Sequence, residues 1–193
     1  MRRAIEHLAD RLSDVIVRQG SKPYRPLYIV SAMIMGATLE LLIIPTLITM
    51  LGKRIDAALG MGSIVSPIAV PYLVAASFLI GIPWLGWSIL WQHRYGKGTP
   101  LPLVPTRVLL GTGPYRFTRN PMTFGAIFWL AGWAVFANSP TALYLGVGGF
   151  ATTVLSYVKL IEEPELERRF GSEYRAYKQR TSFLVPWIAQ HHG

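Results

Sequence analysis

The sequence predicts an all-α, polytopic integral membrane protein whose last two transmembrane helices form a C-terminal hairpin. Hydrophobic residues make up 51% of the 193 residues and charged residues only 15%, whereas a soluble domain carries roughly 25% charged residues. The mean hydropathy is +0.35, and four long apolar runs alternate with basic or polar segments. Because about 20 apolar residues span the hydrocarbon of a bilayer, the four runs predict four transmembrane helices.

The first 26 residues precede the apolar runs, and residues 1–22 have the pattern of an amphipathic helix. Apolar residues recur at helical spacing from Ile5 to Ile16, and charged residues fill the other positions. Such a helix lies in the membrane interface or packs on the polar face of the protein, and both alternatives stay open. No short apolar region precedes a small-residue cleavage site, so we expect no cleavable signal peptide.

The first predicted span is Leu27–Leu51, in which Pro45 predicts a kink. Its one ionisable residue is Glu40. A carboxylate inside a membrane is costly, so Glu40 is a candidate for substrate binding. The alternative is that Glu40 is neutral or is paired with a residue of another helix.

A glycine-containing connection, residues 52–65, leads to the second predicted span, Ser66–Trp91. Pro83 predicts a break within this span, and three tryptophans near its end are typical of a membrane interface. If residues 52–65 contain a re-entrant piece, a fifth crossing is added to the four.

Residues 92–120 form a long loop with four prolines, five basic residues and no acid. Loops of this length are usually functional or disordered, and a basic surface without carboxylates attracts anions. The stretch Gly113–Gly125, GPYRFTRNPMTFG, places arginines, aromatic residues and an asparagine directly before an apolar run. We interpret it as one wall of a binding site at the membrane surface.

Only residues 138–140 separate the third predicted span, Pro121–Ala137, from the fourth, Thr141–Ile161. A connection this short requires an antiparallel helical hairpin. Small residues in the fourth span predict that the backbones approach closely; they are Gly146, Gly148 and Gly149.

The chain becomes charged from Glu162 onward, with the sequence EEPELERRFGSEYRAYKQR. Glu163 before Pro164 predicts a helix break and a new helix with Pro164 in its first turn. The apolar segment 182–190 is expected to dock against the membrane face.

The distribution of lysine and arginine predicts the orientation. Residues 1–26 hold six of them, 52–65 two, 92–120 five, 162–193 five, and 138–140 none. The positive-inside rule then places the N-terminus, the long loop and the C-terminus in the cytosol, with the protein in the cell membrane. The net charge of +9 therefore indicates contact with anionic head groups. Since no nucleic-acid-binding module accompanies it, we expect no nucleic-acid partner.

Motifs that the sequence lacks exclude several reaction classes. There is no HExxH, no GxxxxGK[ST] phosphate loop, no evident Ser-His-Asp set and no cysteine, so we predict no metal. What remains is the paired acid Glu162-Glu163. Because the hairpin returns the end of the fourth span to the start of the third, this pair is expected near Arg119 and Asn120.

Such a cleft suits a zwitterionic, partly aromatic small molecule. Glutamates take an ammonium group or ribose hydroxyls, and an arginine takes a carboxylate. The alternative is a salt-bridged junction that only fastens the hairpin to the tail. The residues alone do not decide between the two.

The segment GPYRFTRNPM, the tight hairpin and EEPELERRFGSEYRAY together resemble the isoprenylcysteine carboxyl methyltransferase and phospholipid methyltransferase superfamily of integral membrane enzymes. The similarity runs from about Gly96 to Trp187, and GKGTPLP before GPYR and RNPM resembles the bacterial and archaeal branch. It implies one membrane methyltransferase domain over residues 1–193, with two spans in 27–91 and the cofactor-binding part in 92–193. The implied cofactor is S-adenosylmethionine, with S-adenosylhomocysteine as product, in a cytosolic pocket.

The resemblance also implies roles for individual residues. The cofactor-binding set is Arg107, Val108, Leu109, Leu110, Tyr115, Asn120, Pro121, Met122, Thr123, Glu162 and Glu163. We assign Arg119, Asn120 and Glu162 to the reaction centre. The candidates for substrate contacts are Lys159, from the resemblance, and Glu40, from its place in the membrane.

Two residues depart from the family pattern, because Asn120 replaces a histidine and Thr123 a tyrosine. An asparagine cannot shuttle a proton near neutral pH, so general-base catalysis is not carried over to this position. Methyl transfer from a sulfonium to an ionised carboxylate needs only alignment and exclusion of water. An amine must lose a proton, for which Glu40 or Glu162 is the candidate base.

The predicted function is S-adenosylmethionine-dependent methyl transfer to a lipophilic, membrane-resident acceptor. The acceptor is the carboxylate of a prenylated cysteine-like compound or a lipid amine, entering from the bilayer. One alternative is an NADPH-dependent membrane reductase on a related helical frame, whose phosphate would bind the loop arginines. The other is a non-enzymatic membrane scaffold. The oligomeric state is not predicted.

Overall fold

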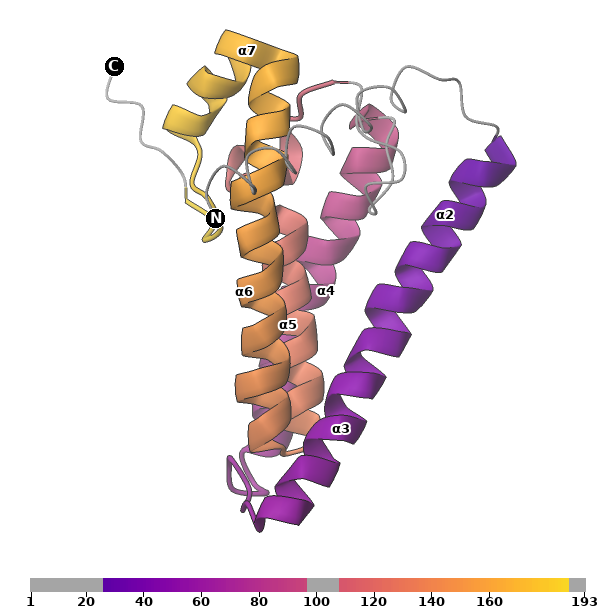
Figure 1. Ribbon diagram of the computed structural model, residues 1–193, viewed down its shortest axis with the longest axis vertical. Helices are drawn as coiled ribbons and strands as arrows, with labels where there is room; N and C mark the ends of the chain where they lie inside the picture. Colours follow the sequence, from indigo (N-terminus) through magenta and orange to yellow (C-terminus); the bar gives the residue numbers. More distant parts are fainter. Residues whose placement is uncertain (1–25, 97–107, 188–193) are drawn as a thin grey trace. The chain divides into compact units, whose positions relative to one another are not determined.

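The computed structural model describes residues 26–96 and 108–187, and Figure 1 shows that helices dominate them. This part of the chain contains no strand, only an isolated parallel bridge between Thr118 and Ser182. The all-α prediction is therefore confirmed. The predicted amphipathic segment, residues 1–22, lies outside the described residues.

Three described helices are long and apolar enough to cross a membrane, counted with their π-helical turns: Ile34–Leu59, Val70–Gly96 and Ala142–Arg180. The remaining predicted span corresponds to α5 (Pro121–Phe136), which has 16 residues. A helix of this length measures about 24 Å, less than the hydrocarbon thickness of about 30 Å. The chain is thus a membrane protein, while its fourth crossing stays a prediction.

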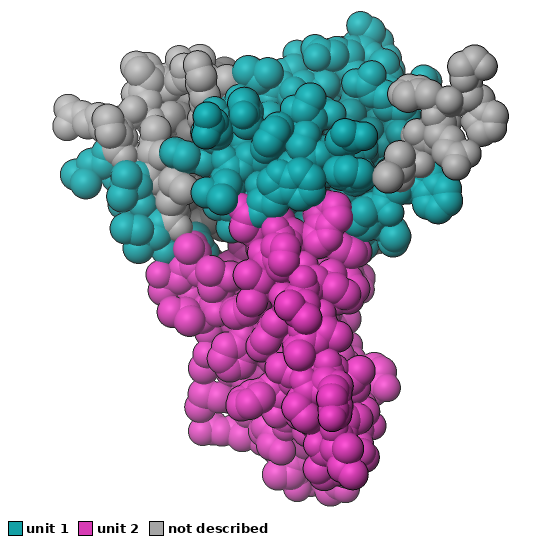
Figure 2. Space-filling model, turned by 180° about the vertical axis from the view of Figure 1, so that it is seen from behind, with its two compact units in different colours: residues 1–36, 87–121, 155–193 teal, residues 37–86, 122–154 magenta. Residues whose placement is uncertain are grey.

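The chain divides into two compact units, coloured separately in Figure 2. The described residues of the first unit are 26–36, 87–96, 108–121 and 155–187. The second unit comprises residues 37–86 and 122–154. Polar contacts dominate the first unit, and apolar helix packing dominates the second.

The first helical run continues past Pro45 through a π-helical segment. It consists of α2 (Pro26–Thr38), η1 (Leu39–Ile43) and α3 (Ile44–Leu59). A proline ring clashes with the carbonyl four residues earlier, here that of Leu41. In a π-helical turn the backbone hydrogen bond joins residues five positions apart instead of four. This local change accommodates the proline without ending the helix. Residues 52–59, predicted as a connection, are therefore helical.

A second π-helical segment precedes Pro164 in the same way. The last helical run consists of η4 (Ala142–Val147), α6 (Gly148–Tyr157), η5 (Val158–Glu162) and α7 (Glu163–Arg180). The break predicted at Glu163-Pro164 is wrong. The kink lies at Gly171, whose φ of 53° and ψ of −123° are accessible to glycine without steric cost.

The break predicted at Pro83 is also wrong, because α4 (Val70–Trp91) runs through this residue and continues as η2 (Gln92–Gly96). Proline is tolerated in apolar spanning helices where local adjustment satisfies the freed carbonyl. This second helix begins at Val70, four residues later than the predicted start at Ser66. It extends to Gly96, beyond the predicted end at Trp91.

Glycines set the helix packing of the second unit. A Cβ atom on Gly81 would lie 2.7 Å from the backbone nitrogen of Trp129, and one on Gly125 would lie 2.7 Å from that of Leu85. The backbones of α4 and α5 therefore approach at distances that no side chain permits. The adjacent core consists of Leu130, Ala134, Ala142 and Val147.

Of the three glycines predicted to mediate hairpin packing, only Gly146 is in close contact. A Cβ atom on it would lie 2.3 Å from Ile48 of α3, whereas Cβ atoms on Gly148 and Gly149 would meet nothing within 4 Å. Close packing thus involves α3, a partner that the hairpin alone did not predict.

The tight hairpin between α5 and the last helical run is confirmed, and α3 and the loop after it hold its turn. Asn138 accepts hydrogen bonds from the backbone nitrogens of Ile64 (2.9 Å) and Val65 (3.2 Å). Asp56, which is 5% exposed, accepts a hydrogen bond from the Ser139 hydroxyl and one from the Thr141 nitrogen at 3.1 Å. The turn is therefore fixed by side chains of its own unit.

Candidate functional site

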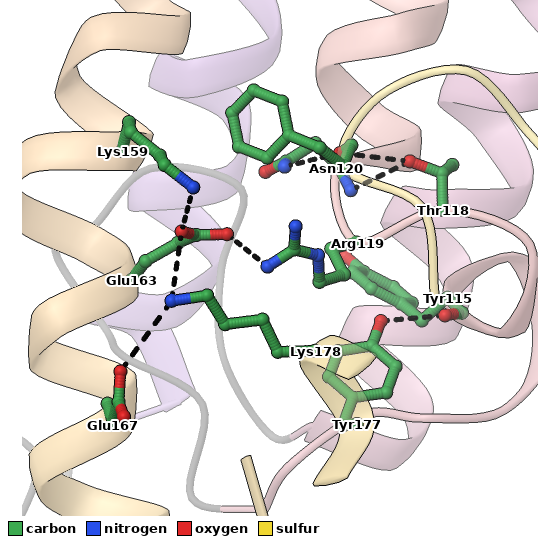
Figure 3. A network of polar contacts seen from close by, with 10 residues as sticks. Tyr115, Thr118, Arg119, Asn120, Lys159, Glu163, Glu167, Tyr177 and Lys178 are labelled. Carbon is green, nitrogen blue, oxygen red and sulfur yellow. Dashed lines mark hydrogen bonds and ion pairs between the residues drawn. The ribbon is translucent and has the colours of Figure 1, made fainter. Parts of the chain in front are cut away.

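The candidate site lies within the first unit, where the loop before α5 meets the junction of η5 and α7 (Figure 3). Arg119 donates from Nη1 to Oε1 of Glu163. The hairpin thus brings one of the paired acids to the arginine, as the short turn predicted.

Glu163 is the centre of this network, and it is 2% exposed. Besides Arg119, it meets Lys159, whose Nζ lies 3.0 Å from Oε2, and Lys178, whose Nζ lies 3.5 Å from the same oxygen. Lys178 also lies 3.6 Å from Glu167. Both oxygens of Glu163 are therefore occupied by cations of the protein itself, which is the arrangement that a buried carboxylate requires.

Glu162, the preceding acid, is in a different environment. It is half-buried and makes no hydrogen bond or ion pair with any other residue that the structure describes. Burial raises the pKa of the Tyr115 phenol, and the nearby Glu162 carboxylate raises it further. The paired acids therefore differ, since Glu163 is saturated by cations and Glu162 keeps its capacity to accept.

Tyr115 lies in a 3₁₀ turn, η3 (Gly113–Arg116), that is held in place from two sides. Its hydroxyl donates to Oε1 of Gln92 at 3.3 Å, and its carbonyl accepts from the Tyr177 hydroxyl at 2.6 Å. Gly113 has φ of +60°, and a Cβ atom on it would lie 2.3 Å from the Trp91 ring. Glycine is thus required there for both backbone and space.

Asn120 fixes the C-terminal segment. Its Nδ2 donates to the Phe183 carbonyl at 2.7 Å, and its backbone nitrogen donates to the Thr118 hydroxyl at 3.2 Å. The Arg119 backbone nitrogen donates to the Ser182 carbonyl at 2.9 Å. Residues 182–187 therefore pack along the loop, and the docking of segment 182–190 on the membrane face stays a prediction.

Several donors in this unit have no acceptor. The Arg119 Nε and Trp91 Nε1 atoms are buried and have no hydrogen-bond partner within residues 26–96 and 108–187. With Glu162 they are two donors and one acceptor of the first unit that lack partners among the described residues. A molecule carrying a carboxylate, an ammonium group and ribose hydroxyls offers the complementary groups, so the residues present fit S-adenosylmethionine.

Comparison with known proteins identifies the family. Residues 71–173 match the sequence model of phospholipid methyltransferases. The chain belongs to this family. The match confirms the superfamily indicated by the sequence motifs, and it spans α4, α5 and the acids at the start of α7.

Two relatives from Bradyrhizobium diazoefficiens are similar to parts of the chain. Methanethiol S-methyltransferase 1 is 39% identical over 97 residues, which cover 50% of this chain and 30% of the relative. Methanethiol S-methyltransferase 2 is 29% identical over 129 residues, covering 58% and 47%. The aligned parts thus span less than half the length of either relative.

The other residues assigned to the site are distributed over both units. In the first unit, Val108 is exposed, Leu109 half-buried, and Leu110 and Pro121 buried. In the second unit, Met122 and Thr123 lie in the first turn of α5, and Glu40 lies half-buried in η1. Arg107 lies outside the described residues. The described network involves none of these side chains.

Sequence reasoning missed several members of the network, Lys178 among them. On a straight helix, 15 residues would separate it from Glu163 by about 22 Å. The kink at Gly171 removes this separation, so the Lys178 Nζ lies 3.5 Å from the carboxylate. The signal in the sequence was a glycine inside a charged helical stretch. The Phe183 carbonyl carries no signal, because every residue has one.

We expect replacement of Glu163 by alanine to destabilise the protein by about 3–5 kcal/mol, because it leaves the Arg119 charge buried and unpaired. The Arg119 side chain is only 10% exposed. The measurement is unfolding of the detergent-solubilised protein. Glu167→Ala is the matched control, because Glu167 is 34% exposed and its loss should cost less than about 1 kcal/mol. Equal losses in both variants would contradict the role given to Glu163.

Proposed function

We propose that the protein transfers a methyl group from S-adenosylmethionine to a lipophilic acceptor at the membrane. The observation that carries this proposal is the contrast between the paired acids in a chain of a methyltransferase family. Glu163 is saturated by protein cations, whereas Glu162 has no partner within the described residues and lies near Tyr115. A half-buried carboxylate and buried donors that lack partners among the described residues of one unit are the kind of polar groups that a binding site for a small polar molecule uses.

In this proposal Glu162 accepts hydrogen bonds from the ammonium group or the ribose of the cofactor. The Arg119 Nε and Trp91 Nε1 atoms, which lack acceptors within the described residues, donate to its carboxylate. Glu163 holds the guanidinium of Arg119 in position and stays paired with it. When bound, S-adenosylmethionine supplies a methyl group that its sulfonium has already activated.

The chain's own contribution to catalysis is alignment and exclusion of water. The side-chain amide of Asn120 donates a hydrogen bond to the Phe183 carbonyl and so fastens the C-terminal segment to the loop. This use of the side chain suits a positioning residue rather than a proton carrier. An acceptor that must lose a proton would depend on Glu162 as the base.

The experiment that tests the proposal is calorimetry with S-adenosylhomocysteine and NADPH on the detergent-solubilised protein. We expect binding of the first ligand only. Glu162→Gln should weaken this binding about 10- to 100-fold, because one charge-assisted hydrogen bond is worth about 1.5–3 kcal/mol. Its unfolding midpoint should not fall, since the carboxylate has no partner to lose among the described residues and its removal relieves the cost of burying an unpaired charge.

Other outcomes distinguish the alternatives. Binding of NADPH alone would support a membrane reductase, and binding of neither ligand would support a scaffold. Unchanged affinity for S-adenosylhomocysteine in Glu162→Gln would remove Glu162 from the site while leaving the methyltransferase assignment in place.

The first acceptor class in the proposal is a prenylated carboxylate or a lipid amine. The names of the two relatives favour a second class, a small apolar thiol, since both are called methanethiol S-methyltransferases. The thiolate is the nucleophilic form of a thiol, so this acceptor, like an amine, needs a base.

Transfer of a labelled methyl group to three acceptors would decide between the classes. The acceptors are a short alkanethiol, a prenylated thiopropionate and phosphatidylethanolamine in mixed micelles. We expect transfer to one of them, with loss of at least about tenfold in Glu162→Gln. Transfer to none, by a protein that binds S-adenosylhomocysteine, would contradict all three acceptor classes.

We also propose four crossings with the N-terminus, the loop before α5 and the C-terminus in the cytosol of a cell-membrane protein. The supporting observations are the basic residues of these segments and the length of Val70–Gly96, 27 residues. A helix of that length measures about 40 Å, enough to place its ends on opposite sides.

Single cysteines test the orientation without background, because the chain has none. Thr112 and Ser63 are both exposed and flank the helix. We expect a membrane-impermeant maleimide to label Thr112→Cys only in inverted vesicles and Ser63→Cys only in right-side-out vesicles. The reverse pattern would overturn the orientation, and labelling of both from one side would overturn the crossing.

A further inference from the structure

The second unit contains a groove that the proposed function does not use. It has a volume of about 350 Å³ and lies between one face of α3 and the C-terminal end of α5. The lining residues are Thr49, Met50, Lys53, Trp133, Phe136 and Ala137. This volume is within the range of small-ligand sites.

The groove is apolar along most of its length. The Thr49 hydroxyl donates to the Pro45 carbonyl of its own helix at 2.8 Å, so its proton is not available to a ligand, while its oxygen can still accept a hydrogen bond. Trp133 and Phe136 pack edge to face with ring centroids 6.2 Å apart and form an aromatic wall. Such a surface suits a hydrocarbon chain.

Two donors remain for the polar end of an occupant. Lys53 is exposed and has no hydrogen bond or ion pair with a described residue, although its charge interacts at longer range with the carboxylate of Asp56. The Nε1 atom of Trp133 is buried and also lacks a partner among these residues. Both are donors only, so together they select an anion.

No acid of this unit lines the groove. The unit contains two acids, Glu40 and Asp56. Asp56 lies one turn beyond Lys53, but its two carboxylate oxygens already accept hydrogen bonds from the Ser139 hydroxyl and the Thr141 backbone nitrogen. The groove therefore offers an ammonium group no carboxylate among its lining residues, which disfavours a zwitterionic head group.

The position of the donors along the helices fits the depth of a lipid head group. Lys53 lies in the C-terminal half of α3, which ends at Leu59. Trp133 lies one turn before the end of α5 at Phe136. Lysine near the end of a spanning helix extends to the interface, and tryptophan is enriched there. Thr49 and Met50 lie further from that end.

We propose that this groove binds an anionic phospholipid. The phosphate meets Lys53 and the indole N–H of Trp133, and one acyl chain lies along Thr49, Met50 and Phe136. The charge complementarity of the donor pair and the apolar wall carry this assignment. It does not depend on the proposed methyl transfer, because it shares no residue with that site.

Native mass spectrometry of the detergent-solubilised full chain tests the proposal, with phosphatidylglycerol and phosphatidylcholine of identical acyl chains as probes. We expect the first adduct to favour phosphatidylglycerol by about fivefold, since a basic residue near an anionic lipid surface is worth about 1 kcal/mol. Lys53→Gln should abolish the preference. Arg54→Gln is the matched control, because Arg54 is exposed beside Lys53 but does not line the groove, and it should keep the preference.

Ala137→Phe provides a second test by filling the groove, and it should reduce adducts of both lipids several-fold. The helical circular dichroism and the unfolding midpoint of each variant establish that it is folded. Trp133→Phe replaces Lys53→Gln if the latter misfolds, with a weakened preference expected. No preference in the unmodified protein, an equal loss in Arg54→Gln, or full binding in Ala137→Phe would each overturn the proposal.

Discussion

The first unit depends on the neutralisation of one buried charge, the carboxylate of Glu163. Removing a carboxylate from water costs several kcal/mol unless cations and hydrogen bonds compensate it. The compensating cations are Arg119 from the loop before α5, Lys159 from η5 and Lys178 from the end of α7. Because these three come from separate parts of the chain, the charge can be buried only when the loop, the helix junction and the kinked helix end are together.

The adjacent acid shows what this arrangement makes available. Consecutive side chains on a helix point in directions about 100° apart, so burying Glu163 in the ion-pair network directs Glu162 elsewhere, near Tyr115. One acid is then structural and the other is free to interact with a ligand. In the proposed function, a ligand would bind and leave at Glu162 without breaking the ion pairs that hold the unit together.

Unpaired donors occur in both units, and the same physical reasoning applies to each. An indole or guanidinium N–H without an acceptor is costly away from water. In the first unit such donors accompany the free carboxylate of Glu162, a combination that suits a zwitterion. In the second unit the donor of Trp133 accompanies Lys53 and an apolar groove, a combination that suits an anion with a hydrocarbon chain. The neighbouring groups therefore determine what each donor can bind.

Some features followed from the sequence because they depend on local patterns. Apolar runs predicted the helices, and the three-residue connection at 138–140 predicted the hairpin and hence the meeting of Arg119 with Glu163. The two methyltransferase motifs predicted the family. The prolines were misleading, because proline was treated as a helix breaker, while π-helical turns before Pro45 and Pro164 allow the helix to continue. Local steric rules do not state which of these adjustments a chain adopts.

The sequence by itself determined the helical class, the hairpin and which segments supply the acids and the arginine, because length, periodicity and spacing encode them. The family followed from the resemblance of two motifs to known methyltransferases. Only the tertiary structure decided that Glu163 is saturated while Glu162 has no partner among the described residues, that Lys178 returns to the network through the kink at Gly171, and that Asn120 holds a carbonyl 63 positions away. These outcomes depend on backbone geometry at single residues and on long-range packing. No local pattern contains either, because the same side chains at the same spacing could meet different partners in another fold.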